Sequence, residues 1–171
     1  MKKQGLPHKQ GMYNPQFEHD ACGIGMLVNI KGGKSHRLVV DAIEILQNLT
    51  HRGGVGSEPD TGDGAGILLQ LPHAFFARVC KNDGIELPAE GCYGVAMMFA
   101  SPDAQRCEKS VQDFCDITGQ EGLAVLGVRP VPVYKGCIGH TAAEVCPSIL
   151  QVFIQRPNGM SRADFERKLY V

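Results

Sequence analysis

The chain has 171 residues, of which 43% are apolar, with 17 basic and 18 acidic side chains and a formal net charge of -1. The apolar fraction can form the core of one domain or of part of a larger one. The balanced charge argues against broad nucleic-acid binding, which needs a concentrated basic face. No apolar run approaches the roughly 20 residues that cross a bilayer, and residues 1–21 carry no signal-peptide stretch. We therefore expect a cytoplasmic protein that binds neither nucleic acid nor membrane.

Residues 1–21 form an irregular leader. Glycines and prolines recur along it, and no acidic residue appears before Glu18. Such punctuation keeps a helix or strand from extending far. From Cys22 the pattern changes, because the stretch 23–30 (GIGMLVNI) is a short apolar run with β-branched members. That run predicts a buried strand.

The remaining elements alternate between helical and strand patterns. Ser35 can cap a helix that runs to about residue 50, because Leu38, Ala42, Ile45 and Leu49 recur on one helical face. The other predicted elements are, in chain order, a strand at 67–71, a helix at 73–81, a strand at 92–100, a helix from Pro102 to about 117, strands at 123–133 and 149–154, and a helix capped by Ser161. This order predicts a mixed α/β or α+β layered domain.

Two glycine-containing stretches resemble nucleotide-binding loops without meeting their requirements. The phosphate-binding loop needs a glycine five positions before Gly33, where this sequence has Val28. The glycine-dense stretch 62–66 precedes a predicted strand, whereas a dinucleotide fingerprint follows a strand and opens a helix. We therefore interpret the first as a surface turn and predict no cofactor site in this segment.

The seven cysteines and six histidines show no metal-binding pattern. No two cysteines are spaced C-x-x-C, and no two histidines are spaced H-x-x-x-H. We therefore predict no metal site. An odd number of cysteines cannot all pair within the chain, and we expect reduced thiols, mostly buried as small apolar groups.

Cys22 differs from the other cysteines because it stands between the irregular leader and the first apolar run. If it becomes the first residue of a mature chain, its own α-amine lies beside its sulfur. The reference pKa of that amine is about 7.7–8.0 and that of a thiol about 8.5, so the amine can take the thiol proton near neutral pH. Cys22 is therefore a candidate nucleophile. A buried thiol remains the alternative on composition alone.

Seven motifs give this sequence a specific family resemblance. They are YNP at 13–15, EHDACGIG at 18–25, LQNLTHRG at 46–53, TGDGAGI at 61–67, PHAFF at 72–76, QVFI at 151–154 and FERKLY at 165–170. In this order they resemble the N-terminal class II glutamine amidotransferase domain, the glutaminase domain, of the glutamate synthase large subunit. The cysteine-glycine-isoleucine start and the histidine-arginine-glycine motif are shared by class II amidotransferases generally. The TGDGAGI and FERKLY motifs are similar to glutamate synthase within that class.

The resemblance implies a fold, a processing event and a catalytic residue. The implied fold is of the α+β class, an N-terminal-nucleophile hydrolase type four-layer αββα sandwich that is incomplete in this chain. Residues 1–21 would be a propeptide, and residues 22–171 the N-terminal part of the amidotransferase domain. Cleavage of the Ala21–Cys22 bond would free Cys22 to attack the side-chain amide of L-glutamine and form a thioester. Arg52 matches the arginine of the histidine-arginine-glycine motif and is expected to support the site or to hold the local loops.

The resemblance also implies partners outside this segment. Ammonia would be channelled to synthase domains of the same large subunit, where 2-oxoglutarate becomes glutamate with the help of FMN and an iron–sulfur cluster. The electrons would come from NADPH or NADH through a small subunit, or from ferredoxin. The resemblance implies that the family's oxyanion-hole asparagine-glycine pair and its arginine-phenylalanine-serine-threonine segment would lie beyond Val171, so we expect this portion alone to be inactive. Another class II amidotransferase, or a non-catalytic module that retains the fold, are the alternatives.

Overall fold

The computed structural model describes residues 8–12, 14, 23–49, 58, 60–62 and 64–170. The chain forms two compact units. The first comprises Met1–Leu69 with Cys137–Ala142, and the second comprises Gln70–Gly136 with Ala143–Val171. Each unit is described by itself.

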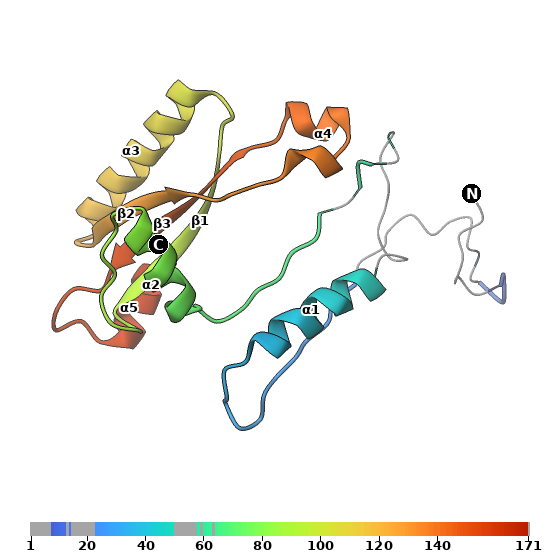
Figure 1. Cartoon of the computed structure of the whole chain (residues 1–171), viewed down its shortest axis with the longest axis horizontal. Helices are drawn as coiled ribbons and strands as arrows, with labels where there is room; N and C mark the ends of the chain where they lie inside the picture. The colour runs from blue at the N-terminus through green and yellow to red at the C-terminus, as the bar shows by residue number, and fades with distance from the viewer. Residues whose placement is uncertain are drawn as a thin grey trace. The chain divides into compact units, whose positions relative to one another are not determined.

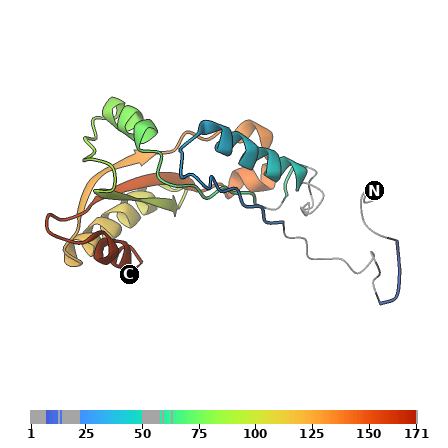
Figure 2. The same cartoon turned by 90° about the horizontal axis from the view of Figure 1, so that it is seen from below.

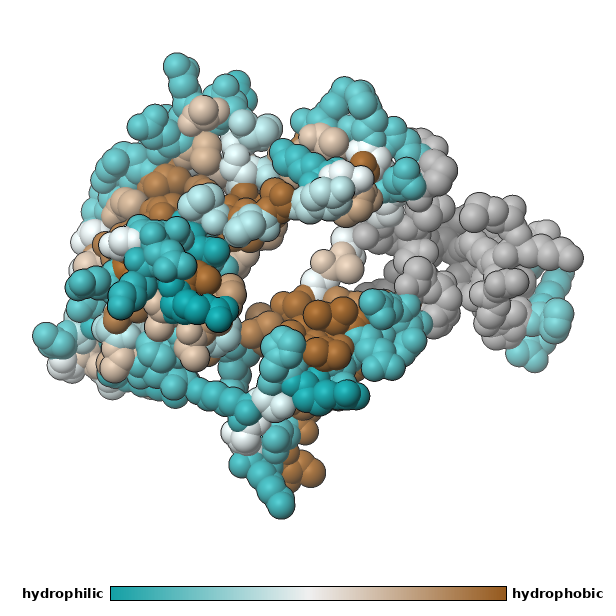
Figure 3. Space-filling model, viewed as in Figure 1, coloured by the Kyte–Doolittle hydropathy of each residue, from teal (hydrophilic) through white to brown (hydrophobic). Residues whose placement is uncertain are grey.

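The first unit contains helix α1, His36–Asn48 (Figure 1). Ser35 caps it as predicted, because the Ser35 hydroxyl oxygen accepts a hydrogen bond of 3.1 Å from the backbone N–H of Arg37. No residue of α1 is buried. Figure 3 shows hydrophobic residues gathered over this helix, and Val40 and Ile43 are among its exposed apolar side chains. The helix therefore forms from its local pattern and its cap.

Two predicted strands, at 23–30 and 67–71, are wrong. The stretches 23–30 and 67–71 have no strand structure, and their apolar side chains are exposed rather than buried; Ile24, for example, is 89% exposed. The β-branched composition of both stretches suits a strand, but a strand also needs a partner with which to form ladder hydrogen bonds. No such ladder forms with any described residue.

The second unit is built on a three-stranded antiparallel sheet (Figure 1). The strands are β1, Tyr93–Ala100; β2, Ala124–Pro130; and β3, Ser148–Gln155. Their order is β1-β3-β2, with β3 in the centre and antiparallel to both neighbours. β1 and β2 are therefore parallel to each other, with β3 between them. All three strands overlap the predicted ranges.

Helices cover both faces of this sheet, as Figure 2 shows. α2, His73–Asn82, lies on one face, where Phe76 and Cys80 pack against Tyr93 and Phe153. α3, Ala104–Gln120, and α5, Arg162–Lys168, lie on the other face. There Phe165 joins a cluster of buried residues around the β3 residues Val152 and Ile154.

Side-chain caps begin two of the helices in this unit. The Asp103 carboxylate caps α3 and accepts a 2.9 Å hydrogen bond from the N–H of Arg106. Ser161 caps α5 as predicted, and it accepts a 3.1 Å bond from the N–H of Asp164. Two short elements, whose residues are divided between the two units, were not predicted: the 3-10 helix η3, Lys135–Cys137, and helix α4, His140–Glu144.

The structure confirms a mixed α+β class with one small antiparallel sheet in its described part. A second sheet, which a four-layer sandwich requires, does not occur among those residues. Nor is any described helix long and apolar enough to span a membrane.

Candidate functional site

The two predicted site residues, Cys22 and Arg52, lie outside the residues that the structure describes. Both belong to the first unit. The structure does describe the chain on one side of each: the stretch 23–30 begins directly after Cys22, and α1 with its C-cap Leu49 ends three residues before Arg52. The candidate site is therefore built from these two flanks.

The two flanks lie against each other through two glycines. A Cβ atom added at Gly23 would be 2.7 Å from Leu49 Cδ2, and one added at Gly25 would overlap the Cγ2 methyl of Ile45. Because real Cβ contacts are never this short, the backbone of the 23–30 stretch approaches α1 as closely as only glycine permits. The residue that follows Cys22 thus contacts the end of α1.

The side chains of the 23–30 stretch alternate with respect to α1. Gly23 and Gly25 face the helix, whereas Ile24, Met26 and Val28 between and after them are exposed. Such alternation is the period of an extended chain. The stretch is therefore extended, but it lacks the partner strand that the predicted buried strand would need.

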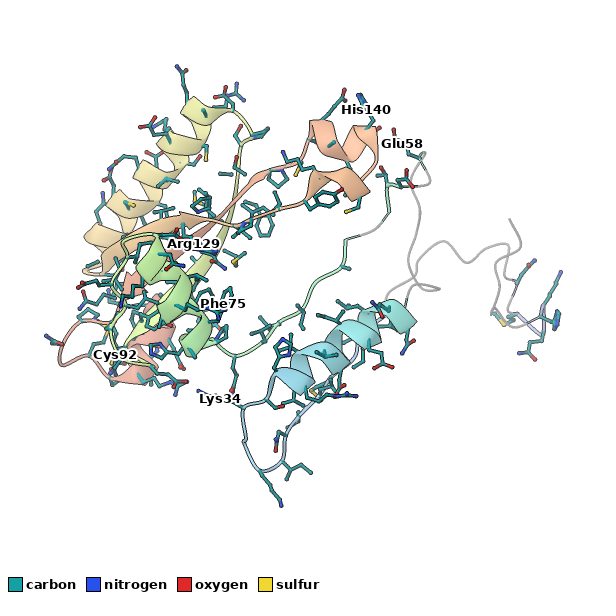
Figure 4. The ribbon with its side chains drawn as sticks, viewed as in Figure 1. Lys34, Glu58, Phe75, Cys92, Arg129 and His140 are labelled. Atoms are coloured by element: carbon teal, nitrogen blue, oxygen red, sulfur yellow. The ribbon has the colours of Figure 1, made fainter. Side chains whose placement is uncertain are left out.

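A second contact in the first unit holds the residues directly before the glycine-dense stretch 62–66. The Glu58 carboxylate oxygen Oε2 accepts hydrogen bonds from the Thr61 hydroxyl, at 2.9 Å, and from the backbone N–H of Thr141, at 3.2 Å. The N–H of Gly139 donates to the carbonyl of Asp60 at 3.0 Å. Figure 4 shows Glu58 beside the start of α4, where His140 lies. We call these contacts the Glu58 clasp.

The Glu58 clasp is polar and tightly fitted. The hydrogen bond from the Thr61 hydroxyl lowers the pKa of the Glu58 carboxyl most, and the bond from the Thr141 backbone lowers it further. Gly139 has no room for a side chain, because an added Cβ would overlap both Thr61 Oγ1 and Glu58 Oε2. Sequence reasoning missed this contact, since 83 residues separate Glu58 from Thr141. The one local signal was the E-x-x-T spacing of Glu58 and Thr61.

The second unit holds a cavity of about 200 Å³, lined in part by Pro88, Cys92, Arg156 and Met160. A guanidinium N–H of Arg156 donates to the Cys92 sulfur at 3.4 Å and another donates to the carbonyl of Met160 at 3.3 Å. The cavity contains none of the predicted site residues.

None of the six described cysteines forms a disulfide with another of them. The expectation that they are mostly buried is wrong, because only Cys80 is fully buried and Cys137 is exposed. Burial raises the pKa of the Cys80 thiol. Among the described residues, no group of three histidine, cysteine or acidic side chains could hold a metal ion. These residues therefore do not fit an iron–sulfur cluster, which needs several cysteine ligands.

The sequence matches one protein family and is similar to several glutamate synthases. The family model for glutamine amidotransferases class-II matches residues 22–171. The chain is 48% identical over 167 residues to the glutamate synthase [NADPH] large chain of Bacillus subtilis, covering 97% of this chain and 11% of that protein. It is 38% identical over 172 residues to the glutamate synthase [NADH] of Schizosaccharomyces pombe, covering 97% of this chain and 8% of that protein.

A plant relative shows the same relationship. The chain is 36% identical over 154 residues to the chloroplastic ferredoxin-dependent glutamate synthase of Spinacia oleracea, covering 90% of this chain and 10% of that protein. The chain thus spans about a tenth of the length of the curated relatives that it matches.

Proposed function

The chain belongs to the class II glutamine amidotransferases, and on that premise we propose that it is the N-terminal part of the glutaminase domain of a glutamate synthase. One observation carries the proposal: the family match begins at Cys22 and continues through residue 171, while the same sequence is 48% identical to a glutamate synthase large chain. The whole domain has the N-terminal-nucleophile architecture, of which the described sheet and helices form one portion.

The proposed reaction starts at the Cys22 thiol after the Ala21–Cys22 bond is cleaved. The freed α-amine takes the thiol proton, and the thiolate attacks the side-chain amide carbon of glutamine. The carbon–nitrogen bond breaks, and the proton held by the amine passes to the departing ammonia. A γ-glutamyl thioester remains on Cys22. Water then attacks this thioester, the carbon–sulfur bond breaks, and glutamate leaves with the thiol restored.

The close packing of the 23–30 stretch on α1 supports this assignment. A nucleophile must be held in a defined position, because a shift of about 1 Å can cost 100-fold in rate. Gly23, the residue after Cys22, is held against Leu49 at the end of α1, and the same helix leads to Arg52 three residues later. We propose that α1 positions both residues and that Arg52 supports the site through the hydrogen-bond donors of its guanidinium.

The other functions of the enzyme belong to the rest of its polypeptide. We propose that the oxyanion donors, the groups that bind the glutamine carboxylate, and the synthase site with FMN and its iron–sulfur cluster lie outside these 171 residues. The share of the relatives that the chain spans supports this division. Ammonia would pass to the synthase site and react there with 2-oxoglutarate. The relatives that match include glutamate synthases named for NADPH, for NADH and for ferredoxin.

A labelling experiment tests the proposal. The full-length polypeptide that contains this chain is incubated with a glutamine analogue that carries an electrophilic carbon in place of the side-chain amide, and the labelled peptides are mapped by mass spectrometry. We expect one adduct, on Cys22, and protection by L-glutamine. Labelling of another cysteine in preference to Cys22, or no protection by glutamine, would contradict the proposed function.

A further inference from the structure

The sheet of the second unit has two edge strands, and they differ in how they are protected. Within the described part of the chain, β1 and β2 each pair only with β3. Every edge strand presents unpaired backbone N–H and C=O groups that can template another strand, and proteins protect such edges with charges, prolines or bulges. The two edges can therefore be compared for these protections.

The edge of β2 is protected. The N–H of Val131 donates to the carbonyl of Ile149 at 2.9 Å, so Val131 faces β3 and the neighbouring Pro130 faces the open edge. Proline has no N–H to offer there. The register between β2 and β3 also shifts between Val125 and Gly127, which marks a bulge. A further strand cannot pair well along this edge.

The edge of β1 has none of these protections. Its sequence, YGVAMMFA, contains no charged residue and no proline, and its register with β3 runs without a shift from Tyr93 to Ala100. The N–H of Arg156 donates to the carbonyl of Cys92 at 2.9 Å, and these two residues continue the same register.

This hydrogen bond fixes which backbone groups of β1 are open. In an antiparallel ladder, every second residue bonds to the neighbouring strand and the residues between them point away. Gly94, Ala96 and Met98 therefore share the parity of Cys92 and face β3. The N–H and C=O groups of Tyr93, Val95, Met97 and Phe99 point to the open edge.

Helix α5 brings the polypeptide to this same edge of the sheet. An added Cβ at Gly94 of β1 would be 2.7 Å from Leu169 Cδ1, and Leu169 is the C-cap of α5. α3 and α5 cover the same face of the sheet (Figure 2). Apart from the short η3 and α4 between β2 and β3, the order β1, α3, β2, β3, α5 therefore matches the first five elements of a β-α-β-β-α-β unit, whose sixth strand lies beside the first.

We propose that the open edge of β1 binds a fourth strand, supplied by the polypeptide that follows α5 in the full-length enzyme. The strand runs antiparallel to β1 and parallel to β3, and bonds to the outward groups of Val95, Met97 and Phe99. The connection from β3 through α5 then repeats the one from β1 through α3 to β2. This inference rests on the proposed function, which makes the chain the first part of a longer enzyme.

Residue-resolved amide hydrogen exchange of the full-length polypeptide tests the inference with an internal control. We expect the amides of Val95, Met97 and Phe99 to exchange at least about 100-fold more slowly than the amide of Val128, which faces the open edge of β2. The inward amides of Gly94 and Ala96 should be protected as well. Equal, fast exchange at Val95, Met97, Phe99 and Val128 would overturn the proposal. Protection that disappears on dilution would overturn it too, since the occupant would then be a second copy of the chain.

A pair of variants at one position gives a second readout. Met97→Pro removes the outward N–H and leaves the β3 ladder intact, whereas Met97→Leu retains the N–H. We expect only Met97→Pro to raise exchange at Val95 and Phe99. Equal exchange in the two variants would count against the fourth strand. Labelling of Cys22 by the glutamine analogue in the same sample reports on the proposed function separately, because it does not depend on β1.

Discussion

Gly25 lies so close to Ile45 that any Cβ atom at position 25 would overlap the Cγ2 methyl of that isoleucine. This methyl is attached directly to the Ile45 Cβ, and a β-branched side chain in a helix has one strongly preferred χ1 rotamer. The methyl therefore cannot move away easily. At Gly23 the neighbouring atoms are the terminal Cδ methyls of Leu49, which are more mobile.

We predict that Gly25→Ala in the full-length enzyme lowers the stability of the glutaminase domain by roughly 1–3 kcal/mol, as overpacking does. It should also lower kcat for glutamine hydrolysis, because the strain lies three residues from Cys22. Gly64→Ala is the matched control, since an added Cβ there meets nothing within 4 Å. Thermal melts and glutaminase assays of both variants measure these effects.

A rescue variant tests the cause of that effect. Ile45→Leu removes the Cγ2 branch but keeps the number of side-chain carbons. The double variant Gly25→Ala, Ile45→Leu should therefore recover part of the stability that Gly25→Ala loses. If the stability loss of the double variant equals the sum of the losses of the two single variants, the contact between the 23–30 stretch and α1 does not hold the segment in place.

We predict that the mature enzyme begins at Cys22. This prediction rests on the irregular leader that ends at Ala21 and on the need for a free α-amine beside the Cys22 sulfur. N-terminal sequencing and the intact mass of the active full-length protein measure it. An active enzyme that still carries residues 1–21 would contradict both the processing step and the amine as the base.

The Glu58 clasp predicts a specific dependence of stability on pH. The folded protein lowers the pKa of Glu58 below its ordinary value of 4.5, so the charged carboxylate stabilises the fold above that value. The stabilisation is lost as the pH falls through the lowered pKa. Wild type should therefore melt at a higher temperature than Glu58→Gln at pH 7, and the difference should shrink below about pH 4.5.

The matched control for Glu58→Gln is the same substitution at the exposed Glu86. It removes one negative charge without touching the clasp. If Glu86→Gln reproduces the pH dependence of Glu58→Gln, the effect comes from net charge alone and the clasp contributes nothing to it.

The thiols of Cys80 and Cys137 should react at different rates. Cys80 is fully buried and its pKa is raised by burial, so little of the reactive thiolate forms near neutral pH. Cys137, which the structure shows exposed, should be alkylated much sooner. Mass mapping after short exposure to iodoacetamide measures the order. Cys80→Ser should lower the free energy of unfolding by on the order of 1–3 kcal/mol. It should leave glutaminase activity nearly unchanged.

The sequence correctly predicted helices that local caps and periodicity stabilise, and strands whose partner strands lie within this chain. Helix α1 followed from the Ser35 cap and its periodic apolar face, and β3 followed from the short apolar run at 149–154; in the structure β3 has a strand neighbour on each side. The stretch 23–30 was mispredicted as buried, because composition reports β-propensity and cannot show whether a partner strand is present.

Part of the candidate site could be predicted from the sequence, and part could not. Cys22 and Arg52 were found through motifs, and they remain predictions because both lie outside the described residues. The Glu58 clasp was not predicted, since its partners at 139–141 come together only through tertiary folding. The exact fit of Gly25 to Ile45 is likewise a property of packing, which a sequence pattern does not reveal.

We propose that Cys22 is the nucleophile of a glutaminase whose ammonia feeds a separate synthase site. The most direct test of this proposal compares two rates in the full-length Cys22→Ala variant: glutamate formation from glutamine and glutamate formation from added ammonium, each with 2-oxoglutarate and the electron donor of the enzyme. We predict that the glutamine-dependent rate falls to background and that the ammonia-dependent rate is largely retained. Retention of the glutamine-dependent rate in this variant would contradict the assignment of Cys22.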